Sequence, residues 1–345
     1  MSISTTMTTA TLDVAAENSA HSGHRIMVFA GRATPELAAE IGRQLGTGLS
    51  PVTLRTFSAG EVYCRYDESI RGADVFLVQS ICANPRTGVN TNDALMELLV
   101  MIDAARGASA RHITAVTPWL GYSRQDKKSA SREPISARLV ARILESAGAD
   151  RVLAMDLHAG QIQGMFAVPL DHMTATIALA QYVRDLRLTG DLVVVAPDVG
   201  RVKHSKSFAG RIGATLAILD KERPVQQVAE IGHVIGDVAG RTAIIVDDIV
   251  DTAGTLAAAC RAVAAAGATG IYALATHGVL SGGAFATLAD APLERLVVTD
   301  TIPLPADAPD WVHVVSCAGV LTDTISRIYT RGSVSAVFGG KNNAF

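Results

Sequence analysis

The chain has 345 residues, of which 49% are hydrophobic and 18% are charged, and its formal net charge is −3. A chain of this length accommodates about two domains of ordinary size, and this composition is typical of a well-buried α/β protein rather than a disordered one. The slightly negative charge excludes a global basic field for nucleic acid or for an anionic membrane, so any phosphate has to be held locally.

Targeting and covalent features give no sign of export. No apolar run approaches the roughly 18–20 residues that span a bilayer, and the N-terminus lacks a secretory signal, so the cytoplasm is the expected compartment. Residues 1–24 are rich in Ser, Thr and Ala without an apolar period, and we expect them to form a disordered tail. The four cysteines have no Cys-x-x-Cys spacing, which argues against a zinc cage or a disulfide framework and favours reduced thiols.

From residue 25 onward, short β-branched runs alternate with helical segments. In the first half we expect strands near 25–31 and at 74–80, 112–119 and 151–158, with helices at 92–109 and 133–149. In the second half we expect helices within 203–214 and 256–268, and strands at 191–198, 215–221, 242–248, 270–278, 296–301 and 312–316. This alternation is typical of parallel strands joined by crossover helices. We therefore predict an α/β fold of two tandem units, residues 25–165 and 166–345, each with a mostly parallel sheet flanked by helices.

Polar clusters follow several of these strands, where ligands bind in open α/β sheets. The most informative is "VDDIVDTAGT" at 246–255, because Thr252, Gly254 and Thr255 open a helix whose free N–H groups favour a phosphate. The neighbouring Asp247 and Asp248 suit the vicinal hydroxyls of a ribose, directly or through Mg²⁺. The simpler alternative is an acidic helix N-cap. A sugar phosphate matches the whole cluster best.

That stretch resembles the phosphoribosyl diphosphate loop shared by type I phosphoribosyltransferases and ribose-phosphate diphosphokinases. Three further segments, "GYSRQDKKSASREPISARL" at 121–139, "DLHAGQIQGMF" at 156–166 and "APDVGR" at 196–201, are similar to motifs of the second family in order and spacing. The resemblance implies two tandem phosphoribosyltransferase-like domains. It also implies transfer of the diphosphoryl group of ATP to the 1-hydroxyl of ribose 5-phosphate, with Mg²⁺ as the metal.

The resemblance assigns roles to residues at matching positions. The implied ATP-binding residues are Ala59, Gly60, Glu61, Arg124 and Gln125, the first three supplied by a neighbouring subunit. Ribose 5-phosphate would be bound by Arg223, Asp247, Asp248, Asp251, Thr252, Ala253, Gly254 and Thr255. His158 and Asp198 match the metal positions, and Lys221 and Arg223 match the catalytic pair of a mobile flap. The family's dimers commonly assemble into hexamers, so we expect a homo-oligomer.

Some positions depart from the family pattern. Ala59 replaces an Asp, and further departures are Ala94, Ala130, Arg201 and Glu222. They leave open a weak regulatory paralogue that assembles with an active enzyme. A phosphoribosyltransferase is a second alternative, because it shares the 246–255 motif, but its chemistry needs neither the tandem units nor "RQDKK".

The C-terminal stretch "GSVSAVF" at 332–338 has two interpretations. Ser333, Ser335 and Phe338 resemble a family segment at an inter-subunit phosphate or nucleotide site, with Arg55 as one candidate cation. The Ser/Val alternation equally favours a half-buried edge strand with Phe338 as a core anchor.

Overall fold

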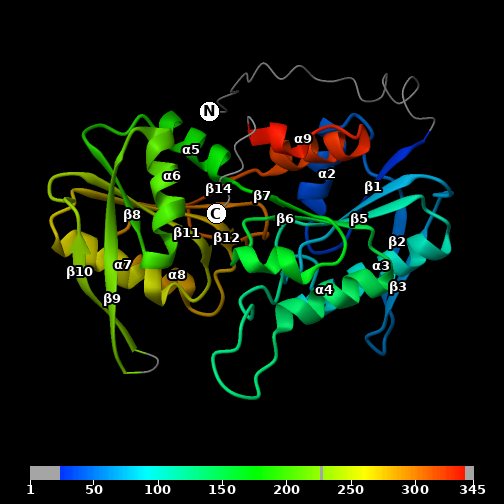
Figure 1. Cartoon of the computed structure of the whole chain (residues 1–345), viewed down its shortest axis with the longest axis horizontal. Coiled ribbons are helices and arrows are strands. Elements are labelled where there is room, and N and C mark those ends of the chain that lie inside the picture. Colours follow the sequence, from blue (N-terminus) through cyan, green and yellow to red (C-terminus); the bar gives the residue numbers. More distant parts are fainter. Residues whose placement is uncertain (1–23, 226–227, 339–345) are drawn as a thin grey trace.

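The computed structural model describes the backbone of residues 24–225 and 228–338, and the side chains of this range outside residues 221–232. Apart from His24, the tail expected at residues 1–24 lies outside the described residues. The elements below follow the labels in Figure 1.

Two sheets of mostly parallel strands and one small hairpin organise the chain. The first sheet has five strands in the order β1 (Ile26–Ala30), β4 (Asp74–Val78), β5 (His112–Thr117), β6 (Arg151–Met155) and β7 (Leu170–Met173). The second has seven, in the order β10 (Val228–Ile235), β9 (Thr215–Val225), β8 (Leu192–Ala196), β11 (Thr242–Val250), β12 (Gly270–Gly278), β13 (Arg295–Thr299) and β14 (Val312–Val315). Antiparallel pairing joins β9 to β10, and β2 (Val52–Thr56) to β3 (Val62–Tyr66).

Helices cover both faces of the two sheets. They are α2 (Pro35–Gln44), α3 (Thr91–Gly107), α4 (Ser136–Ala147), α5 (Thr176–Asp185), α6 (Val202–Ile212), α7 (Gly254–Ala265), α8 (Ala284–Ala289) and α9 (Ala318–Tyr329). Short 3₁₀ turns lie at η1 (Gly160–Met165), η2 (Val199–Arg201) and η3 (Val334–Phe338). The predicted α/β class, with parallel sheets flanked by helices, is confirmed.

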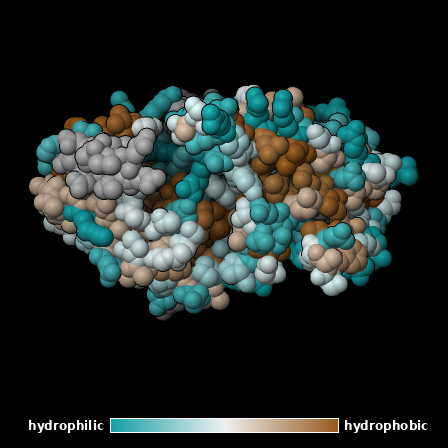
Figure 2. Space-filling view, turned by 90° about the horizontal axis from the view of Figure 1, so that it is seen from below, coloured by the Kyte–Doolittle hydropathy of each residue, from teal (hydrophilic) through white to brown (hydrophobic). Residues whose placement is uncertain are grey.

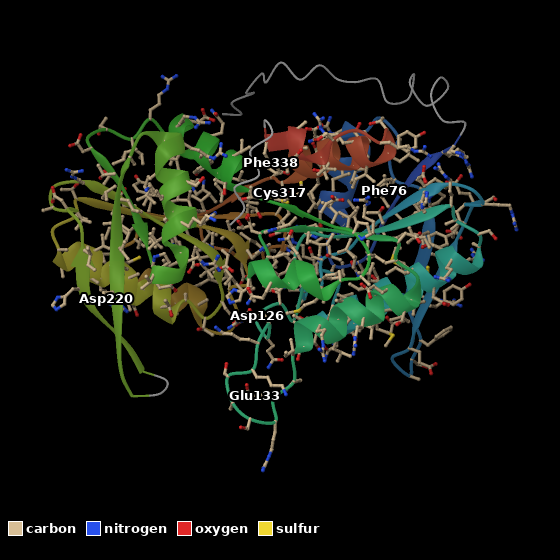
Figure 3. The ribbon with its side chains drawn as sticks, in the orientation of Figure 1. Phe76, Asp126, Glu133, Asp220, Cys317 and Phe338 are labelled. Carbon is tan, nitrogen blue, oxygen red and sulfur yellow. The ribbon has the colours of Figure 1, made fainter. Side chains whose placement is uncertain are left out.

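The hydrophobic cores explain this layering. One core packs α2, α5, α6 and α9 onto the same face of both sheets, and it includes Phe76, Phe208 and Phe338. The opposite faces have separate cores, with α3 and α4 under the first sheet and α7 and α8 under the second. The first of these cores, at the top in Figure 3 and called the upper core below, is continuous across both sheets. Within it, the C-terminal helix α9 packs against α2 of the N-terminal unit.

The sheets also bear on the domain division. Strand β7 lies beyond the predicted boundary at residues 165 and 166, yet it pairs in parallel with β6 of the first sheet. The two-domain division stays a prediction, and the pairing of β7 favours a boundary after residue 173.

The C-terminal stretch and the cysteines give two further outcomes. Residues 334–338 form the 3₁₀ turn η3, so the edge strand expected there is wrong, although Phe338 is buried in the upper core as the same interpretation required. All four cysteines are free thiols, as expected. In the described residues, no helix is long and apolar enough to cross a membrane.

Candidate active site

The carboxyl ends of strands from both sheets meet in one region. The predicted metal ligand His158 follows β6 of the first sheet, and its Nδ1 lies 2.8 Å from a carboxylate oxygen of Asp248 in β11 of the second sheet. Arg124, in the loop after β5, forms an ion pair with Asp251. His158 and Asp248 are 90 residues apart in the chain, and Arg124 and Asp251 are 127 residues apart, yet each pair is in contact. This agrees with the rule that ligands bind at the carboxyl ends of the strands in open α/β sheets.

Two of the predicted acids share a cation. Arg201 Nε lies 3.3 Å from an oxygen of Asp247, and its terminal nitrogen forms an ion pair with Asp248. The same guanidinium donates to the backbone oxygen of His158 at 3.4 Å. The backbone N–H of Arg201 donates to the side chain of Asp198 at 3.2 Å. Arg201 thus joins the predicted metal pair to the predicted ribose acids.

The two adjacent carboxyls have opposite electrostatic behaviour. Burial and the neighbouring charge of Asp248 raise the pKa of Asp247 well above its usual value. Burial opposes ionisation of Asp248 too, but the hydrogen bond with His158 and the charge of Arg201 hold its pKa below the ordinary value. Two adjacent carboxyl groups are difficult to ionise together, because their negative charges repel each other. Asp248 therefore carries most of the negative charge of the pair.

The predicted phosphate loop is shaped for backbone donors. Ala253 has a left-handed φ of 64° directly before α7, a conformation that costs an alanine about 1–2 kcal/mol. Thr252, Gly254 and Thr255 are exposed, whereas Ala253 is buried. The free N–H groups of the first turn of α7 are consequently open to an anion, and strain at Ala253 is a feature found at ligand clamps.

Asp251 is anchored from two sides. Ser281 donates its hydroxyl to one oxygen of Asp251, and Arg124 pairs with the other. Burial raises the pKa of Asp251, but the contacts with Ser281 and Arg124 outweigh burial and hold this pKa below its usual value. Asp251 is therefore ionised at neutral pH and holds Arg124 at the mouth of the loop.

The predicted ATP segments lie in two separate regions of one chain. Arg124 and Gln125 are exposed in the loop after β5, and the amide oxygen of Gln125 accepts a hydrogen bond from Ser136. Ala59, Gly60 and Glu61 form the exposed tip of the β2–β3 hairpin. Figures 1 and 3 show this hairpin at one end of the molecule, well separated from the loop that carries Asp126. The structure does not bring the two segments together within one chain.

The flap residues are described only as backbone. Lys221 and Arg223 lie in β9, where Lys221 pairs with Ile231 of β10. The side chains of Lys221, Glu222 and Arg223 lie outside what the structure describes. Their assigned role stays a prediction.

A buried polar cluster behind the site was missed by the sequence prediction. Asp156 accepts hydrogen bonds from the hydroxyl of Thr276 at 2.6 Å and from the backbone of Ala175 at 2.8 Å. His277 contacts the backbone oxygens of Met155 and Asp156, each at 3.2 Å. The "TH" at the carboxyl end of the predicted strand 270–278 was the available signal. These contacts fasten β12 of the second sheet to the end of β6 in the first.

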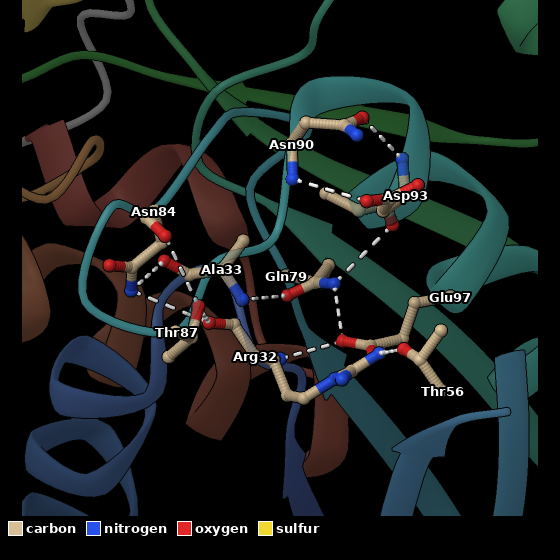
Figure 4. A network of polar contacts seen from close by, with 10 residues as sticks. Arg32, Ala33, Thr56, Gln79, Asn84, Thr87, Asn90, Asp93 and Glu97 are labelled. Carbon is tan, nitrogen blue, oxygen red and sulfur yellow. Dashed lines mark hydrogen bonds and ion pairs between the residues drawn. The ribbon is translucent and has the colours of Figure 1, made fainter. Parts of the chain in front are cut away.

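A second buried network supports the first sheet (Figure 4). Glu97 is fully buried and pairs with Arg32, whose backbone N–H also donates to it at 2.7 Å. The Gln79 side chain donates to the same carboxylate at 2.9 Å and accepts from the N–H of Ala33 at 2.9 Å. Arg32 also donates to Thr56 at 2.9 Å, which fixes where the β2–β3 hairpin leaves the body.

The fold and the site together define a class. They describe an α/β protein with two sheets of the phosphoribosyltransferase type, whose polar side chains meet at the carboxyl ends of the strands. Family models match in chain order: the N-terminal domain of ribose phosphate pyrophosphokinase at residues 26–148, a phosphoribosyl transferase domain at 170–283, and a phosphoribosyl synthetase-associated domain at 231–339.

Individual relatives agree with these models. The ribose-phosphate pyrophosphokinase of Caldanaerobacter subterraneus subsp. tengcongensis is 50% identical over 314 residues, covering 91% of this chain and 98% of the relative. That of Gloeobacter violaceus is 47% identical, covering 91% and 93%. The crystal structure of phosphoribosylpyrophosphate synthetase from Mycobacterium smegmatis has a TM-score of 0.82 at 43% identity, covering 89% of this chain and all of that one. The chain belongs to the ribose-phosphate pyrophosphokinase family.

Proposed function

We propose that the chain transfers the β,γ-diphosphoryl group of ATP to the 1-hydroxyl of ribose 5-phosphate, giving phosphoribosyl diphosphate and AMP. The observation that carries this proposal is the ion pair between Arg124 and Asp251. It brings a side chain suited to nucleotide phosphates against the loop suited to a sugar phosphate, as a transfer between the two substrates requires.

The reaction needs alignment and charge stabilisation rather than a covalent intermediate. The 1-hydroxyl oxygen of ribose attacks the β-phosphorus of ATP, the bond from that phosphorus to the oxygen bridging it to the α-phosphorus breaks, and AMP leaves with that oxygen. The hydroxyl proton is released to solvent. Asp247 and Asp248 accept hydrogen bonds from the ribose hydroxyls, and residues 251–255 hold the 5-phosphate. Lys221 and Arg223 stabilise the charge on the transferred group and on AMP.

Mg²⁺ is the proposed metal, held by Asp198 and His158. Among the described residues, no three His, Cys, Asp or Glu side chains cluster in a way that would hold an ion. Mg²⁺ prefers oxygen ligands and binds through one or two carboxylates together with water and substrate phosphates, which fits the oxygen atoms of Asp198. When bound, it neutralises phosphate charge.

We propose a homo-oligomer in which dimers assemble into a hexamer. The separation between the hairpin tip at residues 59–61 and Arg124 supports it, because a second copy can then supply the tip to the nucleotide. The face carrying α3 and α4 supports it too, since Figure 2 shows a hydrophobic area there and Met96 and Leu139 are 52% and 58% exposed. Light scattering on the purified protein tests the assembly.

The deciding experiment measures AMP release from ATP and ribose 5-phosphate by the purified protein alone. Stoichiometric AMP and phosphoribosyl diphosphate are expected. Their absence, with activity appearing only after an active synthetase is added, would favour the regulatory paralogue motivated by Ala59, Ala94 and Glu222. Release of diphosphate from phosphoribosyl diphosphate and a base would favour a phosphoribosyltransferase.

Regulation by phosphate and ADP remains a proposal tied to the C-terminal segment. Ser333 and Ser335 hydroxyls lie 2.9 Å apart before the buried Phe338. If neighbouring chains add cations such as Arg55, activity depends on inorganic phosphate and ADP inhibits beyond competition with ATP. Full activity in phosphate-free buffer, with purely competitive ADP inhibition, would leave Phe338 as a packing residue only.

A further inference from the structure

The side chain of Arg201 lies between the two adjacent acids of β11. It contacts Asp247 at 3.3 Å and forms an ion pair with Asp248, and it also reaches the backbone oxygen of His158. Only 19% of its side chain is exposed, against 4% for Asp248 and 25% for Asp247. The guanidinium is thus a largely buried part of the site rather than a surface charge.

Arg201 supplies positive charge to both acids. Within the described residues, the only Arg or Lys ion pairs of Asp247 and Asp248 are with Arg201. Asp248 also contacts His158, which carries charge only when protonated. Two carboxylates in sequence, one of them almost fully buried, repel each other strongly unless a cation lies close by.

The backbone holds Arg201 in this position. It ends η2 and immediately precedes α6, and its own N–H donates to Asp198 at 3.2 Å. The side chain leaves this fixed point and crosses to β11. A planar guanidinium can contact two carboxylates through different nitrogens, whereas an ammonium acts as a single point charge.

We propose that Arg201 is a positioning residue that acts as an internal cation for the ribose subsite. It holds Asp247 and Asp248 side by side to accept the vicinal hydroxyls of ribose 5-phosphate, where a pair of free carboxylates would instead recruit a divalent cation. This rests on the proposed function, because it takes ribose 5-phosphate as the ligand of these acids. It assigns a role in sugar binding to a position at which the chain departs from the family pattern.

The first test is steady-state kinetics of Arg201→Met and Arg201→Lys at saturating ATP. Arg201→Met is expected to raise KM for ribose 5-phosphate at least tenfold while kcat falls less, and Arg201→Lys is expected to recover part of the loss. The matched control is Arg261→Met, an exposed arginine on α7, with KM unchanged. An unchanged KM in Arg201→Met, or an effect on kcat alone, overturns the positioning role.

The second test uses Mg²⁺ alone, without substrates, so it does not depend on catalysis. Thermal melting is followed during a Mg²⁺ titration of the wild type, Arg201→Met and the double variant Arg201→Met with Asp247→Asn. Arg201→Met is expected to bind Mg²⁺ at least tenfold more tightly than the wild type, and the double variant to lose this gain. Equal responses of the wild type and Arg201→Met overturn the internal-cation role. A wild type without synthetase activity would refute the proposed function, but the Mg²⁺ titration would still test the internal-cation role, because it needs no catalysis.

Discussion

Replacing Thr276 by valine tests whether the buried contact between the two sheets stabilises the protein. The Thr276 hydroxyl donates to the Asp156 carboxylate at 2.6 Å, and the two residues are 1% and 6% exposed. Valine keeps the shape but removes the hydroxyl donor, and the backbone N–H of Ala175 still donates to that carboxylate at 2.8 Å.

The expected loss in the free energy of unfolding follows from the type of hydrogen bond removed. A hydrogen bond to a charged group contributes about 1.5–3 kcal/mol, and an unsatisfied buried acceptor costs the same order. The unfolding entropy is ~2.1 cal/mol/K per residue, so over 345 residues this loss lowers Tm by about 2–4 °C. The loss of this donor also raises the pKa of Asp156, because the Thr276 hydrogen bond is one of the contacts that hold it below its usual value against burial.

Differential scanning calorimetry and urea unfolding measure this change. The matched control is Thr287→Val on α8, whose hydroxyl donates to the backbone oxygen of the exposed N-cap residue Gly283. Its effect on the free energy of unfolding should stay within about 0.5 kcal/mol. If Thr276→Val is as stable as the control, the hydrogen bond between the two sheets does not stabilise the fold.

Three further predictions concern the flap, the phosphate loop and acid stability. Lys221→Ala should lower kcat by orders of magnitude with KM for ribose 5-phosphate nearly unchanged, because a charge contact made in the transition state affects the chemical step; steady-state kinetics in which KM rises at constant kcat would contradict it. Thr255→Val should weaken ribose 5-phosphate binding, and calorimetric titration showing wild-type affinity would refute the loop assignment. Burial lowers the pKa of His277 and lowers that of His172 to about 4, so both are neutral in the folded protein while the unfolded chain takes up protons below about pH 6.5. Stability should therefore fall as the pH drops from 6.5 toward 4, by roughly 3 kcal/mol for His172, and urea midpoints for His172→Gln should depend less on pH than those of the exposed control His112→Gln.

The sequence by itself determined the class of fold and the segments of the site. Strand β8 is a short, fully apolar run, and β4 is apolar after its first residue, Asp74. The intervening helices keep a helical period, so the local pattern was enough to predict parallel sheets. The rule that ligands bind at the carboxyl ends of strands pointed to Asp247, Asp248 and the loop to Thr255 without any knowledge of contacts. The family resemblance added Asp198.

Short or irregular elements could not be predicted from the local pattern of apolar residues. Strand β7 has four residues, and the hairpin β2–β3 and the 3₁₀ turn at Val334–Phe338 depend on what they pack against. The Ser/Val alternation before Phe338 suggested a strand, but anchoring of Phe338 in the upper core is compatible with a tight turn. Tertiary packing overrides a weak local preference of this kind.

Only the tertiary structure decided which charges meet. Arg124 with Asp251, and His158 with Asp248, are separated by 127 and 90 residues, and sequence spacing carries no distance over such separations. The single upper core across both sheets, the contact of Thr276 with Asp156, and the position of Arg201 between two acids arise because the two units pack on each other. Electrostatic energy depends on distance and burial, and both are properties of the folded chain.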